Sequence, residues 1–161
     1  MEIDPVKYGV MWERVQNNDR RFDDLKELTV SEAAARNGWD NTPNEKETAN
    51  LIRLAQFLEK VKVVLKNKPV IVNSAYRCKK VNDAVGSKDS SQHRLGCAAD
   101  IRVPGMTPDQ VVRAVIASNL DYDQVIREFD SWTHISVPNI AGAAPRKQAL
   151  IIDKAGARLF K

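Results

Sequence analysis

The feature that most constrains the fold is one long amphipathic segment followed by a series of short apolar runs. The segment starts at the capping-box sequence Thr42-Pro-Asn-Glu45, continues to about Lys66 and carries a core-facing apolar stripe at helical spacing. Five runs rich in β-branched and apolar residues follow, at 69–76, 98–103, 123–129, 132–137 and 147–153, and the final GARLFK predicts another short strand. This order predicts an α+β fold with helices packed on a largely antiparallel central sheet.

Three further segments have helix signals. Capping boxes at Thr29-Val-Ser-Glu32 and Thr107-Pro-Asp-Gln110 predict short helices, the second of which ends near Ser118. Asp4-Pro5 resembles an N-cap followed by a first-turn proline, and apolar residues recur from there to about Leu28. We therefore expect residues 1–28 to form an N-terminal amphipathic helical extension. It would pack on the main domain (29–161), self-associate or dock a partner.

Composition excludes several classes of protein. A chain of 161 residues with 43% hydrophobic and 29% charged residues is typical of one globular domain. It has no apolar run near the roughly 20 residues that span a bilayer and no apolar signal core at the N-terminus, so we expect cytoplasmic synthesis without a signal peptide and no integral membrane protein. The net charge of +4 suits a solvated surface or an anionic partner such as the bacterial cell wall. No nucleic-acid motif is present, so we expect no nucleic-acid partner.

The chain has only two histidines, and both flank predicted strands. His93 lies in SSQHRLGCAADI, seven residues before Asp100, and His134 lies in SWTHISV. Because alternate residues of a strand share a face, pairing of the two strands would place Asp100 and His134 on one side of a sheet. Two imidazoles and a carboxylate can hold a catalytic zinc with its fourth position open. Spacing alone is not decisive, since a lone histidine is more often a surface or capping residue.

A longer pattern resembles the M15 family of zinc peptidases, which includes D-Ala-D-Ala carboxypeptidases and L-alanyl-D-glutamate endolysins. The stretches SAYRCKKVNDAVGSKDSSQHRLGCAADI and IREFDSWTHISV contain four family motifs in order, and the chain is most similar to the phage and prophage branch. The resemblance runs from about Leu28 to the C-terminus. It implies a hedgehog/DD-peptidase-like zinc peptidase domain over 29–161, with one Zn2+ per chain held by His93, Asp100 and His134.

The same resemblance implies two substrate contacts. Arg77, in SAYR, matches the arginine that holds a substrate carboxylate or carbonyl, a role suited to the planar fork of a guanidinium. Ser91, or Gln92 beside it, matches a polar residue near the substrate backbone.

The general base departs from the commonest family pattern. Several members carry an acid three residues before the last histidine, where this chain has Ser131. The branch with E-F-x-x-W-x-H carries its glutamate at the position of Glu128, so the resemblance favours Glu128, with Asp130 as the alternative. Both acids have the parity of His134 in a regular strand, and a bulge or turn after Phe129 would change that.

The resemblance implies a zinc metallopeptidase that hydrolyses peptide bonds in peptidoglycan stem peptides, of the D,D-carboxypeptidase or L-alanyl-D-glutamate endopeptidase type. Its partner would be bacterial peptidoglycan. A phage endolysin, released after synthesis in the host cytoplasm, or a virion-associated lysin would fit. One alternative is a phage structural or wall-binding module with little activity, which Ser131 and the N-terminal extension favour. A metal-free domain that binds cell wall or nucleic acid is another.

Overall fold

The computed structural model describes residues 25–161, so the extension predicted for 1–28 lies outside the described residues except for its last four positions. Every other predicted element is present. The helices are α2 (Lys26–Thr29), α3 (Glu32–Asn37), α4 (Glu45–Val64), α5 (Lys79–Ala84), α6 (Gln92–Leu95) and α7 (Pro108–Ala117). The strands are β1 (Ile71–Ser74), β2 (Ala98–Arg102), β3 (Gln124–Glu128), β4 (Trp132–Ser136), β5 (Gln148–Asp153) and β6 (Gly156–Leu159).

The strands form one six-stranded sheet in the order β1-β2-β4-β3-β5-β6. Every neighbouring pair is antiparallel except β3 and β5, which run parallel. The parallel pair arises because the chain leaves β4 and returns to the start of β3 before it enters β5. The predicted α+β class with a largely antiparallel sheet is therefore confirmed.

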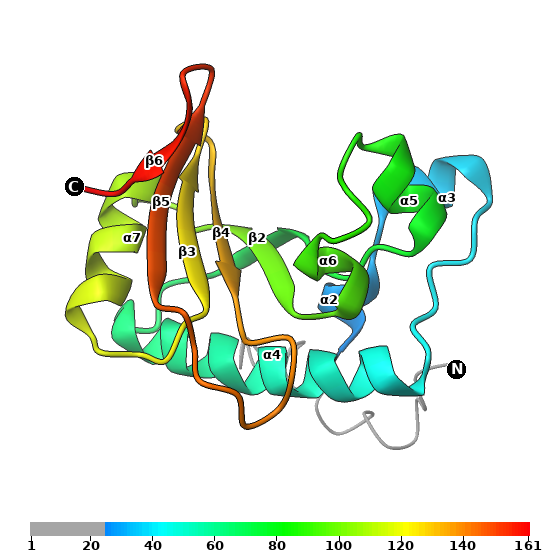
Figure 1. The fold of residues 1–161 in the computed structure, drawn as a ribbon, viewed down its shortest axis with the longest axis horizontal. Coiled ribbons are helices and arrows are strands. Elements are labelled where there is room, and N and C mark those ends of the chain that lie inside the picture. Colours follow the sequence, from blue (N-terminus) through cyan, green and yellow to red (C-terminus); the bar gives the residue numbers. More distant parts are fainter. Residues whose placement is uncertain (1–24) are drawn as a thin grey trace.

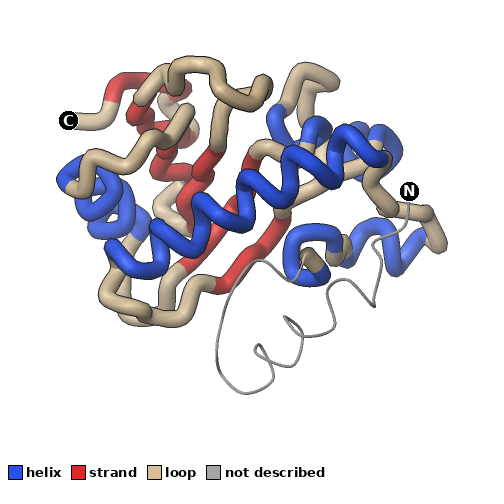
Figure 2. The backbone as a smooth tube through the Cα atoms, turned by 90° about the horizontal axis from the view of Figure 1, so that it is seen from below, coloured by secondary structure: helices blue, strands red, loops and turns tan. Residues whose placement is uncertain are grey.

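One face of the sheet carries the hydrophobic core. Helix α4 crosses this face (Figure 2), and α7 packs beside it against β3 and β4. The apolar stripe of α4 is fully buried, as are the alternate residues of the central strands; the cluster includes Leu51, Leu54, Leu58, Val61, Ile101, Val125 and Ile135. The other face of β2, β3 and β4 carries the polar side chains predicted to act together. The short helices α2, α3, α5 and α6 gather beyond the β1 side of the sheet (Figure 1).

Two helix starts differ from the predicted ones. Helix α3 is capped by Ser31, not Thr29, and α4 by Asn44, not Thr42. Asn44 and Glu47 form the reciprocal capping box, so the helix begins two residues later than the Thr42 pattern predicts. A glutamate three residues on does not decide the cap, because Thr29 is followed by Glu32 at that distance and Ser31 caps α3 instead. The box at 107–110 is confirmed, with proline in the first turn.

Among residues 25–161, no helix combines the length and the apolar character that crossing a bilayer requires.

Candidate metal centre

Asp100 and His134 lie side by side on neighbouring strands. They are direct partners in the antiparallel register of β2 and β4, so their side chains project from the same face of the sheet. The Oδ1 atom of Asp100 is 3.1 Å from Nδ1 of His134. The predicted pairing of these two residues is thus confirmed.

His93 reaches the pair from the one-turn helix α6. The helix ends at Gly96, whose φ of 78° is a left-handed C-cap conformation. A Cβ atom at this position would lie 2.7 Å from the backbone oxygen of Glu47 in α4. Glycine therefore allows α6 to approach α4 closely, and this approach brings His93 to the strands.

The hydrogen bonds of His93 determine which nitrogen faces the pair. Its Nδ1 lies 2.6 Å from the carbonyl oxygen of Ala75. A carbonyl can only accept, so Nδ1 carries the proton and the lone pair of Nε2 is free. Nε2 lies 3.3 Å from Oδ1 of Asp100. The ring is thereby oriented as a metal-binding histidine requires.

The three side chains fit a tetrahedral zinc ion. One ligand atom from each of His93, Asp100 and His134 lies within 4.8 Å of the others, and all three residues are buried. Zinc binds such ligands at about 2.0–2.2 Å, and tetrahedral angles then separate neighbouring ligand atoms by roughly 3.3–3.6 Å. The observed 3.3 Å and 3.1 Å separations from Asp100 Oδ1 are close to that value. Imidazole and carboxylate donors also suit zinc.

The electrostatics favour the protonation states that ligands need. Burial acts to raise the pKa of Asp100, but the two histidines outweigh burial and hold that pKa well below its usual range. Burial also lowers the pKa of His93, which favours the neutral imidazole. An ionised carboxylate and a neutral histidine are the forms that bind a metal ion.

Arg77 holds the second oxygen of Asp100. Its side chain is 13% exposed, and its terminal Nη2 donates to Asp100 Oδ2 at 3.1 Å. Its Nε donates to Ser74 Oγ at 3.0 Å, and Ser74 is the β1 partner of Asp100 in the sheet. Arg77 therefore fixes the orientation of the carboxylate and leaves Oδ1 to the histidines.

Glu128 is the acid that the fold brings to the cluster. It ends β3, opposite Trp132 in β4, and its Oε1 lies 3.9 Å from Nδ1 of His134. Burial raises the pKa of Glu128, and the negative charge of Asp100 raises it further. A carboxylate with a raised pKa is suited to accept a proton and return it.

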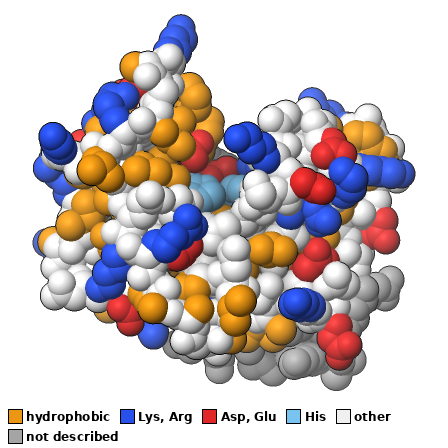
Figure 3. Space-filling model, viewed as in Figure 1, with side chains coloured by type: hydrophobic (Ala, Val, Ile, Leu, Met, Phe, Trp, Pro, Cys, Tyr) orange, Lys and Arg blue, Asp and Glu red, His pale blue; other side chains and the backbone are white. Residues whose placement is uncertain are grey.

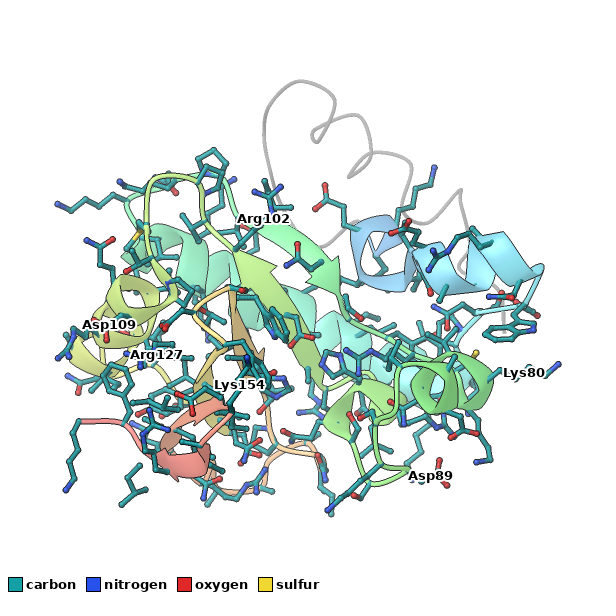
Figure 4. All side chains as sticks on the ribbon, turned by 90° about the horizontal axis from the view of Figure 1, so that it is seen from above. Lys80, Asp89, Arg102, Asp109, Arg127 and Lys154 are labelled. Carbon is teal, nitrogen blue, oxygen red and sulfur yellow. The ribbon has the colours of Figure 1, made fainter. Side chains whose placement is uncertain are left out.

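Asp130 is placed on a turn, outside the cluster. Phe129 and Asp130 both have left-handed φ angles, of 52° and 51°, so the strand is interrupted between Glu128 and Trp132. The Asp130 side chain is 75% exposed and pairs with Nε of Arg127 at 3.1 Å. Arg127 also pairs with Asp109 of α7, beside it in Figure 4. The regular strand thus brings Glu128 to the face of His134, and the turn at Phe129 and Asp130 takes Asp130 away from it.

Ser91 and Gln92 support the local structure around His93. Ser91 caps α6 by accepting the amide of His93, and Gln92 is buried. The Gln92 amide nitrogen lies 3.0 Å from Asp123 Oδ2 and 2.7 Å from Asn139 Oδ1. Their predicted contact with substrate stays a prediction.

The buried Asp123, which no sequence motif marks, joins α6 to the loop before β5. Its carboxylate binds Gln92 and also the guanidinium of Arg146, at 2.7 Å. The only sequence signal is an acidic residue at the head of an apolar run, and nothing in it indicates either partner.

The surface above the cluster is hollowed. Figure 3 shows the histidine side chains at the bottom of a depression between the sheet and the short helices. A substrate chain can therefore approach the cluster from the face that lies away from α4.

Comparison with known proteins identifies one matching family. The family model for peptidase M15 matches residues 22–136, more than half of the chain. The matched region includes the three candidate ligands together with Arg77 and Glu128. No curated protein matches the chain significantly. With this match and a buried His-Asp-His group suited to a metal ion, the chain belongs to the peptidase M15 family of metallopeptidases.

Proposed function

We propose that this protein is a zinc-dependent peptidase that hydrolyses peptide bonds in peptidoglycan stem peptides. The observation that carries the proposal is the buried triangle of His93, Asp100 and His134 with a carboxylate of raised pKa, Glu128, beside it. Membership of the M15 family supports a hydrolase. The D,D-carboxypeptidase and L-alanyl-D-glutamate endopeptidase reactions are the two candidate activities.

The residues of the site have separate roles in this proposal. His93, Asp100 and His134 would hold zinc, which supplies a water of lowered pKa and polarises the scissile carbonyl. Glu128 Oε1 accepts a proton from the attacking water and passes it to the amide nitrogen as the C–N bond breaks. Arg77 keeps Asp100 oriented, and its remaining donors are suited to a substrate carbonyl or carboxylate.

The proposed partner is bacterial peptidoglycan, and the proposed setting is a phage endolysin or a virion-associated lysin. The net charge of +4 supports association with an anionic wall polymer. In this proposal the protein is made in the host cytoplasm and acts on the wall after release, or is carried on a virion. The extension over residues 1–28 would then be a docking or self-association segment.

Purified peptidoglycan tests the proposal. The zinc-loaded protein should reduce the turbidity of a wall suspension, and a chelator should stop this. Glu128→Gln should lower the rate by at least about 100-fold, the usual contribution of a general base. Asp130→Asn, a matched change of an acid two residues away, should leave the rate within about twofold. Mass spectrometry of the released fragments identifies the bond that is cut.

A second candidate is a wall-binding module that retains the fold. Ser131 favours it, because this exposed residue stands where several family members carry the catalytic acid. Such a module would sediment with peptidoglycan and release no fragments when folded and zinc-loaded. That result would overturn the peptidase proposal.

A further inference from the structure

Trp132 faces Glu128 across the β3–β4 hairpin. The two residues are direct partners in the antiparallel register, so both side chains project from the face that carries His134. Side chains directly opposite each other on neighbouring strands have Cβ atoms roughly 4.5–5.5 Å apart. The indole therefore lies directly across the hairpin from Glu128.

The indole nitrogen of Trp132 is a buried hydrogen-bond donor. Its Nε1 makes no hydrogen bond within the part of the chain that the structure describes. Indole N–H is a donor only, and buried donors normally have a partner. The Glu128 carboxylate is its partner position across the hairpin, and the indole N–H acts to lower the pKa of Glu128, against the effect of burial.

The ring of Trp132 is fixed by its neighbour on the turn. The Phe129 ring packs on it with centroids 5.8 Å apart and planes tilted by 36°. The Phe129 amide donates to the Ile152 carbonyl oxygen at 2.9 Å, which ties the turn to β5. The indole therefore presents its N–H from a defined position.

We propose that Trp132 is a positioning residue that directs the Glu128 carboxylate through its indole N–H. Glu128 has three rotatable side-chain bonds, and its carboxylate interacts with the charges of Asp100, His134 and Arg77, which constrain its direction less than a hydrogen bond does. A hydrogen bond from a fixed indole supplies that direction. The inference rests on the proposed peptidase function, since it assigns how the proton-accepting group of that reaction is held.

A spectroscopic test reports the contact itself and needs no activity. The chain has three tryptophans, Trp12, Trp39 and Trp132, so a proton–nitrogen spectrum of the labelled full-length protein has three indole signals. The indole signal that is absent from the Trp132→Phe spectrum belongs to Trp132. Glu128→Gln should shift this signal upfield, because a charged acceptor is lost, and Asp130→Asn should leave it in place. An indole signal of Trp132 that Glu128→Gln does not move overturns the proposal.

A kinetic test separates positioning from a structural role. Trp132→Phe keeps an aromatic ring and loses the N–H, so kcat should fall about tenfold, the effect of losing a hydrogen bond to a charged group, with KM within about twofold. In the Glu128→Gln protein the same change should lower kcat no further. Trp39→Phe, the same exchange at another half-buried indole, should change neither constant.

The outcomes are distinguishable from a failure of the proposed function. If Trp132→Phe lowered kcat equally in the wild-type and Glu128→Gln proteins, or changed KM alone, the positioning role would be contradicted. The proposed peptidase function would be unaffected. A wild-type protein without activity would contradict the peptidase, and the indole shift would still decide whether Trp132 holds Glu128.

Discussion

Asp100 is the residue on which the candidate site converges. Its Oδ1 atom faces both histidines, and its Oδ2 atom accepts from Arg77. A carboxylate held at both oxygens cannot rotate freely, so its orientation toward a metal ion is set before the ion binds. Arg77 is thus a support for the site whether or not it also contacts substrate.

This support predicts a loss of metal affinity when Arg77 is removed. Arg77→Ala should weaken zinc binding by about 10- to 100-fold, the usual effect of losing a partner of a metal ligand. Equilibrium competition with a chromophoric chelator measures this directly. Lys79→Ala, at an exposed cation two residues along the chain, is the matched control. Unchanged zinc affinity with a raised KM would restrict Arg77 to substrate binding.

At the scale of elements, the site depends on how closely α6 approaches α4. Gly96 and Gly38 both end helices with a left-handed φ, of 78° and 66°. A Cβ atom at Gly96 would meet the Glu47 backbone oxygen, whereas one at Gly38 would meet no atom within 4 Å. The two glycines therefore share the same backbone requirement and differ only in the contact with α4.

Alanine should therefore destabilise the protein more at Gly96 than at Gly38. Gly38→Ala should cost about 1–2 kcal/mol of unfolding free energy, the penalty for a left-handed residue with a side chain. Gly96→Ala should cost more, and because its side chain would push α6 from α4, it should also weaken zinc binding by displacing His93. Urea unfolding and zinc titration of both variants measure this. Equal costs with unchanged zinc affinity would mean that α6 relaxes without moving the site.

The sequence predicts which segments form helices and strands better than it predicts where they end and which elements they contact. Alternating or β-branched runs predict strands because a half-buried sheet needs that pattern. The same alternation predicts that Asp100 and His134 share one face of the sheet, and the register that makes them direct partners comes from the structure. Parity failed for Asp130, because Phe129 and Asp130 form a left-handed turn without glycine. The parallel pairing of β3 with β5 and the hydrogen bond from His93 to Ala75 depend on tertiary placement, which has no local signal.

At the scale of the whole molecule, Asp123 connects helix α6 to the loop before β5. Gln92 reaches it from α6 on one side, and Arg146 from the loop before β5 on the other. Burial acts to raise the pKa of Asp123, but the hydrogen bonds from Arg146 and Gln92 outweigh burial and lower it. The ionised carboxylate is therefore the form that holds α6 and this loop together.

Because folding changes the pKa of Asp123, the stability that this residue contributes should depend on pH. Since folding lowers the pKa of Asp123, its contribution to stability is full above the unfolded value of about 3.9 and is lost as the pH falls through the folded value. Asp123→Asn should therefore destabilise the metal-free protein most at pH 7, and the difference from wild type should shrink below about pH 4. Urea unfolding at pH 7 and pH 3 measures both values. Asp121→Asn, at an exposed acid nearby, should show no such dependence, and a difference that stays constant with pH would mean that Asp123 acts by packing and not by charge.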